Sequence, residues 1–330
     1  MDQKGPLLIK EAKKLSHGQQ FFGKFLILEK NHRRTKDGKE IYNLRMGDTS
    51  GEIDAIVWES CPVAGKLETG AVIAMLGDMG SFNGKIQINA KKVKVQEDED
   101  PLHYVRQPGV PLATLQQKLD EMLAVIDDPY LQLLMESIFT PDFKERFYKG
   151  TAAKRIHHNY NGGLLEHTLS VAELCNETAD HYPHLNRELL LCGALLHDIG
   201  KLDEYEVKVT PQYTVEGRLI GHIVIGSEFI SKHIAKLRLQ GLDFPEELEW
   251  MLKHMILSHH GNLEYGSPVI PLFPEAFVLH EMDDLDAKMF IFSNKIEEHD
   301  GEEELFTNYD SFFGQQFFTY RYQSQGKIEK

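Results

Sequence analysis

Hydrophobic and polar residues alternate along the first third of the chain in the pattern of short strands. Between residues 18 and 95, apolar runs are broken by Gly and Asp, and Ile53, Ala55 and Val57 fall on one face of such a run. We expect five strands, with an irregular connection over Glu59–Thr69 between the third and the fourth. Five short strands arranged in this way predict a small β-barrel of the OB type.

From residue 112 onwards, apolar positions recur every three or four residues, which is typical of amphipathic helices. A short hairpin is expected at Glu206–Arg218, where Val and Tyr alternate around Pro211. The remainder predicts an all-α domain, so the chain is a multi-domain protein of both α and β structure. The expected helices cover residues 112–126, 130–139, 141–148, 163–179, 189–197, 222–239, 246–258 and 274–299.

The composition changes between these regions, where residues 97–111 combine an acidic run with three prolines. Such a segment is typical of a linker. We therefore predict a barrel at residues 1–96, a linker at 97–111, an all-α domain at 112–300 and a tail at 301–330. The tail holds eight aromatic residues, which we expect to fold back on the core, cover the rim of a functional site or contact a second subunit of a homo-oligomer.

Charge is distributed unevenly over a chain whose formal net charge is −15. Residues 1–96 carry 16 Lys and Arg against 11 Asp and Glu, whereas the rest carries 20 against 40. Such asymmetry suggests different partners for the two regions. The basic region suits a polyanion, and the acidic region has the carboxylates and histidines to hold divalent cations.

The sequence indicates a reducing compartment and no membrane. It contains no apolar run of about eighteen residues, and its first residues lack the apolar stretch of a signal peptide. The three cysteines, Cys61, Cys175 and Cys192, are widely separated and odd in number, which favours free thiols. We expect a cytoplasmic protein.

Metal-ligand residue types are concentrated in the helical region. An apolar helix runs directly into the adjacent pair His197-Asp198, and Gly200 and Lys201 follow. Imidazole and carboxylate together suit Mn, Fe, Co or Zn, and a carboxylate can bridge two cations. A lone His-Asp pair is more often a structural hydrogen bond. Here several more ligand-type residues occur in order along the chain: His167 before the pair, then His222, His259, His260 and Asp283 after it.

These residues resemble the signature of the HD-domain phosphohydrolases. His167, His197-Asp198 and Asp283 are similar to its H…HD…D pattern, and Met282–Lys288 is similar to the closing AD-x-L-D-A-K motif, with Met at the first position. The resemblance implies two divalent cations, with Mn²⁺ favoured and Fe, Co, Zn or Mg as alternatives. It assigns one cation to His167, His197, Asp198 and Asp283, and a second to Asp198, His222, His259 and His260.

Some roles stay open at this point. Asp284 competes with Asp283 as a ligand, and His254 competes with His259 and His260. The resemblance gives Asp198 and Lys201 catalytic roles, with Lys201 neutralising a phosphate oxygen, although a Lys near a helix terminus is also explained by the helix dipole. Main-chain carbonyls or acids such as Glu166 could orient the ligating imidazoles.

The predicted barrel resembles the OB modules of nucleic-acid enzymes, through the segment from Thr35 to Trp58. Exposed rings on such modules stack on bases. Tyr42 and Trp58 could equally pack in or at the rim of the barrel core. The candidate contacts in the barrel are Arg33, Arg34, Lys36, Tyr42, Arg45, Trp58, Phe82 and Lys85. Near the first ligand helix, Arg155, His157, His158 and Tyr160 could position a terminal nucleotide or serve the fold.

The whole arrangement is similar to the YhaM family of bacterial 3′→5′ exoribonucleases, over roughly residues 15–300. The blocks Gly162–Leu169 and Leu196–Lys201 carry most of this resemblance. It implies hydrolysis of single-stranded RNA to nucleoside monophosphates, with single-stranded DNA as an open alternative. Two other functions are weighed: a single-stranded nucleic-acid-binding replication or regulatory factor, and a phosphohydrolase of small nucleotides. Against the latter, the Gly-Tyr-Pro extension of the cyclic-dinucleotide enzymes is absent after Gly261.

Overall fold

A computed structural model describes residues 5–34, 38–82, 85–105, 108–152, 160, 162–206, 210–299 and 305–320. The chain divides into two compact units, residues 1–286 and 287–330, which are described separately. Among the described residues, no helix combines the length and hydropathy needed to cross a membrane. The domain limits predicted from the sequence stay a prediction.

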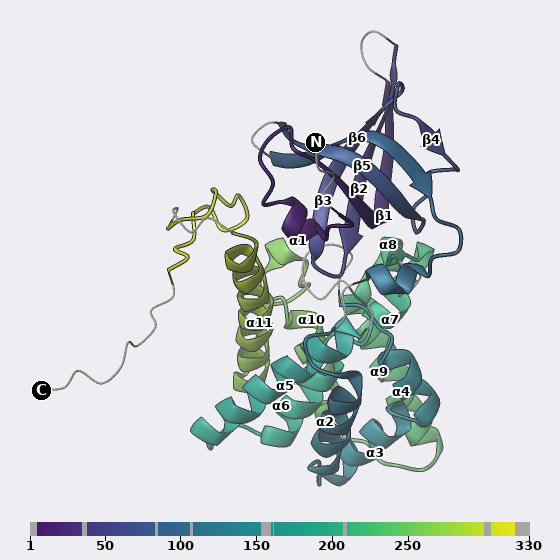
Figure 1. The fold of residues 1–330 in the computed structure, drawn as a ribbon. Coiled ribbons are helices and arrows are strands. Elements are labelled where there is room, and N and C mark those ends of the chain that lie inside the picture. Colours follow the sequence, from purple (N-terminus) through teal and green to yellow (C-terminus); the bar gives the residue numbers. More distant parts are fainter. Residues whose placement is uncertain are drawn as a thin grey trace, which may run out of the picture. The chain divides into compact units, whose positions relative to one another are not determined.

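The first unit begins with a β-barrel, which Figure 1 shows in purple and blue. Its strands follow the order β3-β2-β1-β5-β6-β4, and a parallel pairing between β3 and β6 closes the barrel. This confirms the predicted OB-type barrel, and the two-residue β4 lies in the connection that was predicted to be irregular. The strands are β1 (Gln20–Arg34), β2 (Glu40–Asp48), β3 (Gly51–Trp58), β4 (Val63–Ala64), β5 (Val72–Phe82) and β6 (Lys85–Val95).

Strand β1 is longer than the sequence pattern predicted. The apolar run Phe21–Leu28 predicts a first strand, and the basic, turn-rich run from Asn31 to Gly38 predicts a loop after it, but β1 continues to Arg34. Its first half pairs with β5 and its second half with β2, with an irregular register between Ile27 and Glu29. The polar second half is stable as a strand because β2 satisfies its backbone hydrogen bonds. The residues predicted to form a basic loop, Arg33 and Arg34, therefore lie on a strand, and Lys36 lies outside the described residues.

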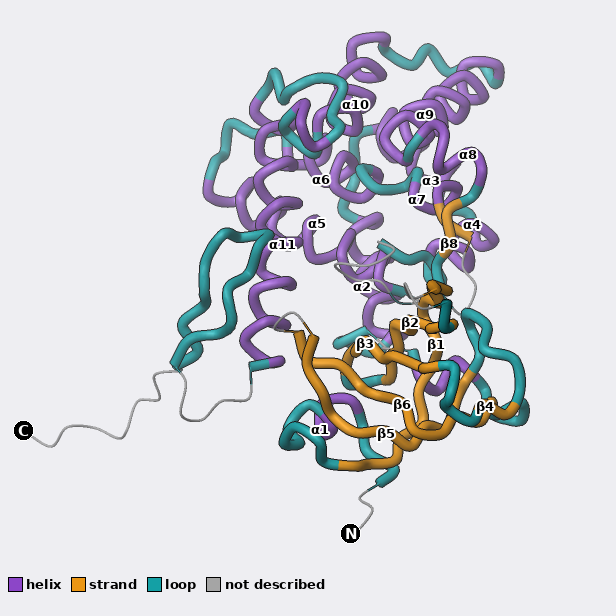
Figure 2. Tube along the Cα trace, turned by 90° about the horizontal axis from the view of Figure 1, so that it is seen from above, coloured by secondary structure: helices purple, strands orange, loops and turns teal. Residues whose placement is uncertain are grey.

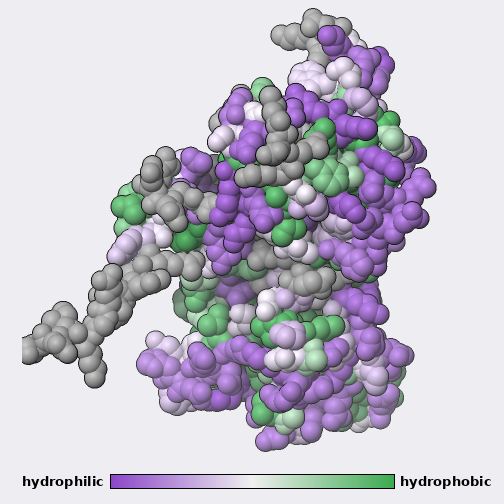
Figure 3. All heavy atoms as spheres, in the orientation of Figure 1, coloured by the Kyte–Doolittle hydropathy of each residue, from purple (hydrophilic) through white to green (hydrophobic). Residues whose placement is uncertain are grey.

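Apolar side chains on alternate positions of these strands fill the barrel. Phe21, Phe25 and Met46 are fully buried, as is Ile9 of the short helix α1 (Ile9–Ala12). The main-chain N–H of Ile9 donates to Asp48 Oδ2 at 2.7 Å, which ties this helix to β2. On the face seen in Figure 3, hydrophilic residues cover most of the surface and hydrophobic ones form scattered patches.

A helical domain follows, and Figure 2 shows its helices in purple. Most of the helices were predicted within a few residues of their observed limits. Their buried faces share one core, to which Leu134, Leu164 and Leu190 belong. After the 3₁₀ segment Pro101–Tyr104, the helices of the first unit are α2 (Leu112–Ala124), α3 (Pro129–Ile138), α4 (Pro141–Phe147), α5 (Gly163–His181), α6 (Arg187–Leu196), α7 (Lys201–Glu204), α8 (Val215–Ile220), α9 (His222–Leu239) and α10 (Glu246–Ser258); a 3₁₀ turn covers Leu263–Tyr265, and α11 (Pro274–Glu298) runs into the second unit.

The hairpin predicted at Glu206–Arg218 is wrong in its second half. Among the described residues of this segment, β7 (Tyr205–Glu206) pairs with β8 (Gln212–Tyr213), and α8 begins two residues after Tyr213. The side chain of Thr214 accepts a hydrogen bond from the N–H of Gly217 at 2.8 Å. This N-cap satisfies a free donor of the first helical turn and favours a helix where the alternation of residues suggested a strand.

In the second unit, aromatic residues of the tail pack on the end of α11. The ring centroids of Phe317 and Phe292 lie 4.1 Å apart, and Phe317 is buried. Lys295 and Asp310 form an ion pair at 3.2 Å. Part of the tail therefore packs on the helix that precedes it, whereas Tyr309 and Phe312 are about two-thirds exposed, and the three roles expected for the tail stay predictions.

Candidate metal centre

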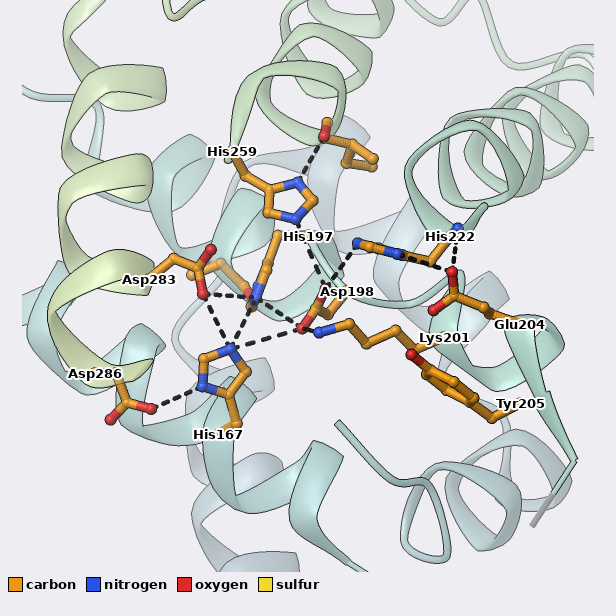
Figure 4. A network of polar contacts seen from close by, with 12 residues as sticks. His167, His197, Asp198, Lys201, Glu204, Tyr205, His222, His259, Asp283 and Asp286 are labelled. Carbon is orange, nitrogen blue, oxygen red and sulfur yellow. Dashed lines mark hydrogen bonds and ion pairs between the residues drawn. The ribbon is translucent and has the colours of Figure 1, made fainter. Parts of the chain in front are cut away.

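Asp198 lies at the centre of a buried cluster of imidazoles and carboxylates (Figure 4). Its two oxygens face different neighbours. Oδ2 lies 3.6 Å from His167 Nε2 and 3.3 Å from His197 Nε2, whereas Oδ1 lies 3.6 Å from His222 Nε2 and 3.7 Å from His259 Nε2. The carboxylate therefore divides the cluster into two halves and belongs to both. We call them the first and the second half.

The first half brings together the four ligands predicted for one cation. His167 comes from α5, and His197 and Asp198 follow directly after α6. Asp283 comes from α11, and its Oδ1 lies 3.0 Å from His167 Nε2 and 3.7 Å from His197 Nε2. Asp283, rather than the alternative Asp284, is thus the aspartate that contacts these imidazoles.

The second half consists of His222 and His259, which face the other oxygen of Asp198, together with His260 beside them. One ligand atom from each of the three histidines lies within 4.8 Å of those of the other two. His254, the alternative ligand, instead accepts a hydrogen bond at Nε2 from the N–H of Leu272 at 3.1 Å. The structure therefore brings both His259 and His260 to the cluster and engages His254 elsewhere.

Three atoms at the middle of the cluster have no hydrogen-bond partner among the described residues. They are Asp198 Oδ1, His222 Nε2 and His259 Nε2, and all three are buried. An unsatisfied buried polar group costs roughly 1–3 kcal/mol. A cation between them would satisfy all three, because lone pairs of neutral imidazole and carboxylate are the donors that transition metals use. The residues present thus fit a divalent cation.

Each of the five imidazoles has its Nδ1 already bonded, which leaves its Nε2 to face the cluster. Fixing one ring nitrogen sets the tautomer and the orientation of a metal-binding histidine. The partners of Nδ1 are Asp286 for His167 (2.7 Å), Ala194 O for His197 (2.8 Å), Glu204 for His222 (3.3 Å), Ile256 O for His259 (2.6 Å) and Tyr265 O for His260 (2.9 Å).

His197 and His259 are held by the same local device. Each immediately follows the last residue of a helix, α6 or α10, and each Nδ1 bonds the main-chain carbonyl three residues earlier. Carbonyls of a last helical turn lack partners within the helix. Apolar helices that end in a histidine therefore satisfy a free carbonyl and aim the imidazole at the same time.

The protonation states suit cation binding in most of the cluster. Burial raises the pKa of the Asp198 carboxyl, but Lys201 and His197 outweigh this and hold the pKa well below its usual range. Burial also lowers the pKa of His259 well below its usual value. For His167, burial lowers the pKa, but hydrogen bonds with Asp283 and Asp286 outweigh it and raise the pKa to about 10. A cation binds His167 only once that proton has left.

Lys201 and Gly200 complete the turn after the His-Asp pair. Lys201 Nζ lies 2.6 Å from Asp198 Oδ2, and this lysine is 8% exposed. Gly200 packs directly on α9, because a Cβ there would lie 2.0 Å from the main-chain oxygen of His222. The absence of a side chain at this position lets the turn carrying Asp198 approach the helix that carries His222.

Three residues of this site were missed from the sequence. The hydroxyl of Ser170 donates a hydrogen bond to Asp286 beside His167. Glu204 accepts hydrogen bonds from both Nδ1 and the main-chain N–H of His222. Asp286 stands three residues after Asp283, within the motif already noted, so helical spacing was the available signal. Glu166, suggested as an orienting acid, instead accepts a hydrogen bond from the N–H of Gly109 at 2.9 Å.

Of the four residues before α5 that could position a terminal nucleotide, one lies among the described residues. Tyr160 is 3% exposed, and its hydroxyl donates to Glu166. This contact favours the structural alternative for Tyr160. Arg155, His157 and His158 lie outside the described residues.

On the barrel, five of the predicted nucleic-acid contacts share the outer face of the sheet. The inward positions of β3 are Ile53, Ala55 and Val57, so Trp58 points outward, and cross-strand neighbours lie on the same face. Trp58 is 43% and Phe82 is 66% exposed. By strand register, this outer face carries Arg33, Arg45, Trp58, Phe82 and Lys85.

Tyr42 and Arg34 lie on the other side of these strands. Tyr42 is opposite the buried Val57, packs against the barrel core and stacks on His32, with ring centroids 5.0 Å apart. Arg34 forms an ion pair with Glu40 at 3.1 Å. The geometry therefore favours the packing alternative for Tyr42, and it separates both residues from the outer face.

Comparisons with known proteins agree with this architecture. The model of the HD domain family matches residues 164–288, which confirms the predicted HD domain. The chain is 34% identical over 284 residues to the 3′-5′ exoribonuclease YhaM of Oceanobacillus iheyensis, covering 85% of this chain and 88% of that protein. It is 32% identical to the protein of the same name from a Geobacillus species, covering 79% of this chain and 80% of that protein.

Among solved structures, the second OB-fold domain of replication protein A from Methanococcus maripaludis aligns with 26% of this chain and 93% of its own, at 15% identity and a TM-score of 0.22. The two exoribonuclease relatives, by contrast, match across most of the chain, through the barrel region as well as the helical one. The chain belongs to the YhaM family.

Proposed function

We propose that the protein is a metal-dependent 3′→5′ exoribonuclease that hydrolyses single-stranded RNA to nucleoside monophosphates. The observation that carries this proposal is the division of one buried cluster by the two oxygens of Asp198, with three unsatisfied ligand atoms at its middle. The relatives named 3′-5′ exoribonuclease support the substrate and the direction of attack. Single-stranded DNA is a further candidate substrate.

In this proposal each half of the cluster would hold one divalent cation. The mixed imidazole and carboxylate ligands suit Mn²⁺, Fe, Co or Zn, with Mg as a further alternative, and the resemblance to the YhaM family favours Mn²⁺. When bound, the cations supply Lewis-acid polarisation of the phosphodiester and a lowered pKa for an attacking water. One cation would be held by His167, His197, Asp198 and Asp283, and the other by Asp198, His222, His259 and His260.

The protein groups around this centre have separate tasks. Asp198 links the two halves, so that both act on one phosphodiester. Lys201 carries a buried positive charge at the edge of the cluster, where it can neutralise a non-bridging phosphate oxygen as negative charge develops. The centre is itself buried, with His167 and His197 fully buried and Asp198 2% exposed, so bulk water is excluded and these electrostatic interactions are stronger.

The barrel is proposed to hold the single strand. Its outer face combines the exposed rings of Trp58 and Phe82 with the cations Arg33, Arg45 and Lys85. Rings stack on bases of any identity, and cations contact the phosphates, so this combination suits binding without strong sequence preference. The exposed aromatic residues of the tail, such as Tyr309 and Phe312, are proposed to take part in a homo-oligomer.

The test is a time course with single-stranded RNA labelled at its 5′ end. With Mn²⁺ we expect a ladder that shortens from the 3′ end, and with chelator we expect intact RNA. A 3′-phosphate or a complementary strand should block the shortening, because the enzyme needs a free single-stranded 3′ end. Hydrolysis of small nucleotides alone would indicate a small-nucleotide phosphohydrolase, and binding without degradation would indicate a binding factor.

A further inference from the structure

Helix α11 presents carboxylates to both ring nitrogens of His167 (Figure 4). Asp283 Oδ1 lies 3.0 Å from Nε2, and Asp286 Oδ2 lies 2.7 Å from Nδ1. The two aspartates are three residues apart on one helix, so they lie on the same face, one turn apart. Asp283 belongs to the proposed ligand set, whereas Asp286 contacts the side of the ring that faces away from the cluster.

Asp286 is itself held in place. Its second oxygen, Oδ1, accepts a hydrogen bond from the hydroxyl of Ser170, and its side chain is 13% exposed. Ser170 lies on α5, three residues after His167, so one turn of α5 supplies both contacts to the Asp286 carboxylate. With both oxygens bonded, Asp286 has one orientation, and so does the imidazole that it contacts.

The partner of His167 differs in charge from the partners of three other imidazoles. The Nδ1 atoms of His197, His259 and His260 contact neutral main-chain carbonyls. An ionised acceptor makes a stronger hydrogen bond than a neutral one, and it increases the basicity of the imidazole. Asp286 should therefore strengthen the bond from His167 to a cation as well as orient the ring.

We propose that Asp286 is a positioning residue for the cation of the first half, and that Ser170 fixes Asp286 for this task. The inference rests on the proposed function, because it takes the cluster to bind divalent cations. Asp286 acts through His167 and does not contact the substrate. Its removal is expected to weaken cation binding without disturbing the fold.

The test measures Mn²⁺ binding to the metal-stripped full chain by isothermal titration calorimetry. Asp286→Asn preserves the shape of the side chain and removes its charge, and we expect it to weaken one of the two binding events by about 10–100-fold. Ser170→Ala should weaken the same event by a smaller factor. Glu281→Gln is the control, because it removes one charge from the same helix at a side chain that is 48% exposed, and it should bind as the wild type does.

Thermal unfolding followed by circular dichroism checks that each variant is folded, and Ser170→Ala provides a milder variant should Asp286→Asn fail to fold. If the wild type binds Mn²⁺ and both folded variants match its affinity within twofold, this inference is wrong while the proposed function stands. If the wild type binds no Mn²⁺ at all, the proposed function fails together with the inference.

Discussion

An Asp198→Ala variant is expected to degrade single-stranded RNA at least about 1000-fold more slowly than the wild type. Asp198 faces all four of the nearest imidazoles, so its loss removes a ligand from both halves of the cluster at once. Lewis-acid stabilisation by bound metal is worth several kcal/mol, and each 1.36 kcal/mol corresponds to a tenfold change in rate. The initial rate of shortening of 5′-labelled RNA with Mn²⁺ measures this effect.

The same substitution also leaves Lys201 buried without its ion-pair partner, which typically costs 3–5 kcal/mol of stability. Asp198→Asn keeps the shape and a hydrogen-bond acceptor, so it serves as the second variant, with folding checked by circular dichroism. Asp180→Ala on α5, whose carboxylate is 63% exposed, is the control and should retain full activity. Folded Asp198 variants that keep more than a tenth of the wild-type rate would contradict the role given to this residue.

The second large effect is expected on the barrel. A Trp58→Ala, Phe82→Ala double variant should bind single-stranded RNA about 30-fold or more weakly, because each base–aromatic stack is worth about 1–3 kcal/mol. Both rings are exposed and lie on the outer face of the sheet. Since neither belongs to the metal centre, kcat at saturating RNA should stay near the wild-type value while KM rises.

Fluorescence anisotropy with labelled RNA, in the presence of chelator to prevent hydrolysis, gives the dissociation constants. The chain offers a matched control, because its only other tryptophan, Trp250 on α10, is 58% exposed. Trp250→Ala removes an equally large exposed ring from the helical domain and should leave Kd unchanged. Equal affinity of the double variant and the wild type would exclude the outer face as the RNA-binding surface.

The proposed ligands could be predicted from the sequence because each stands in a motif that is read locally. His197 and His259 follow apolar helices at the point where those helices end, and Asp283 lies in a motif of regular spacing. The sequence also placed these helices well, since their apolar faces repeat with helical period. The acids that hold the imidazoles of His167 and His222 in place, however, are distant from them in the sequence.

The supporting residues were missed for this reason. Asp286 meets His167 across 119 positions of sequence, and Glu204 meets His222 across 18. Glu166, the nearest acid in sequence to His167, bonds Gly109 instead, because adjacent residues on a helix point in different directions. In the barrel, the polar half of β1 gained its strand structure from pairing with β2, which no pattern within β1 itself indicates.

The central claim is that the two halves around Asp198 each hold a divalent cation. Anomalous diffraction from crystals grown with Mn²⁺ tests it most directly. The account predicts two anomalous peaks on either side of the Asp198 carboxylate, one beside His167, His197 and Asp283, and one beside His222, His259 and His260. Well-ordered side chains in this cluster with no anomalous peak between them would contradict it.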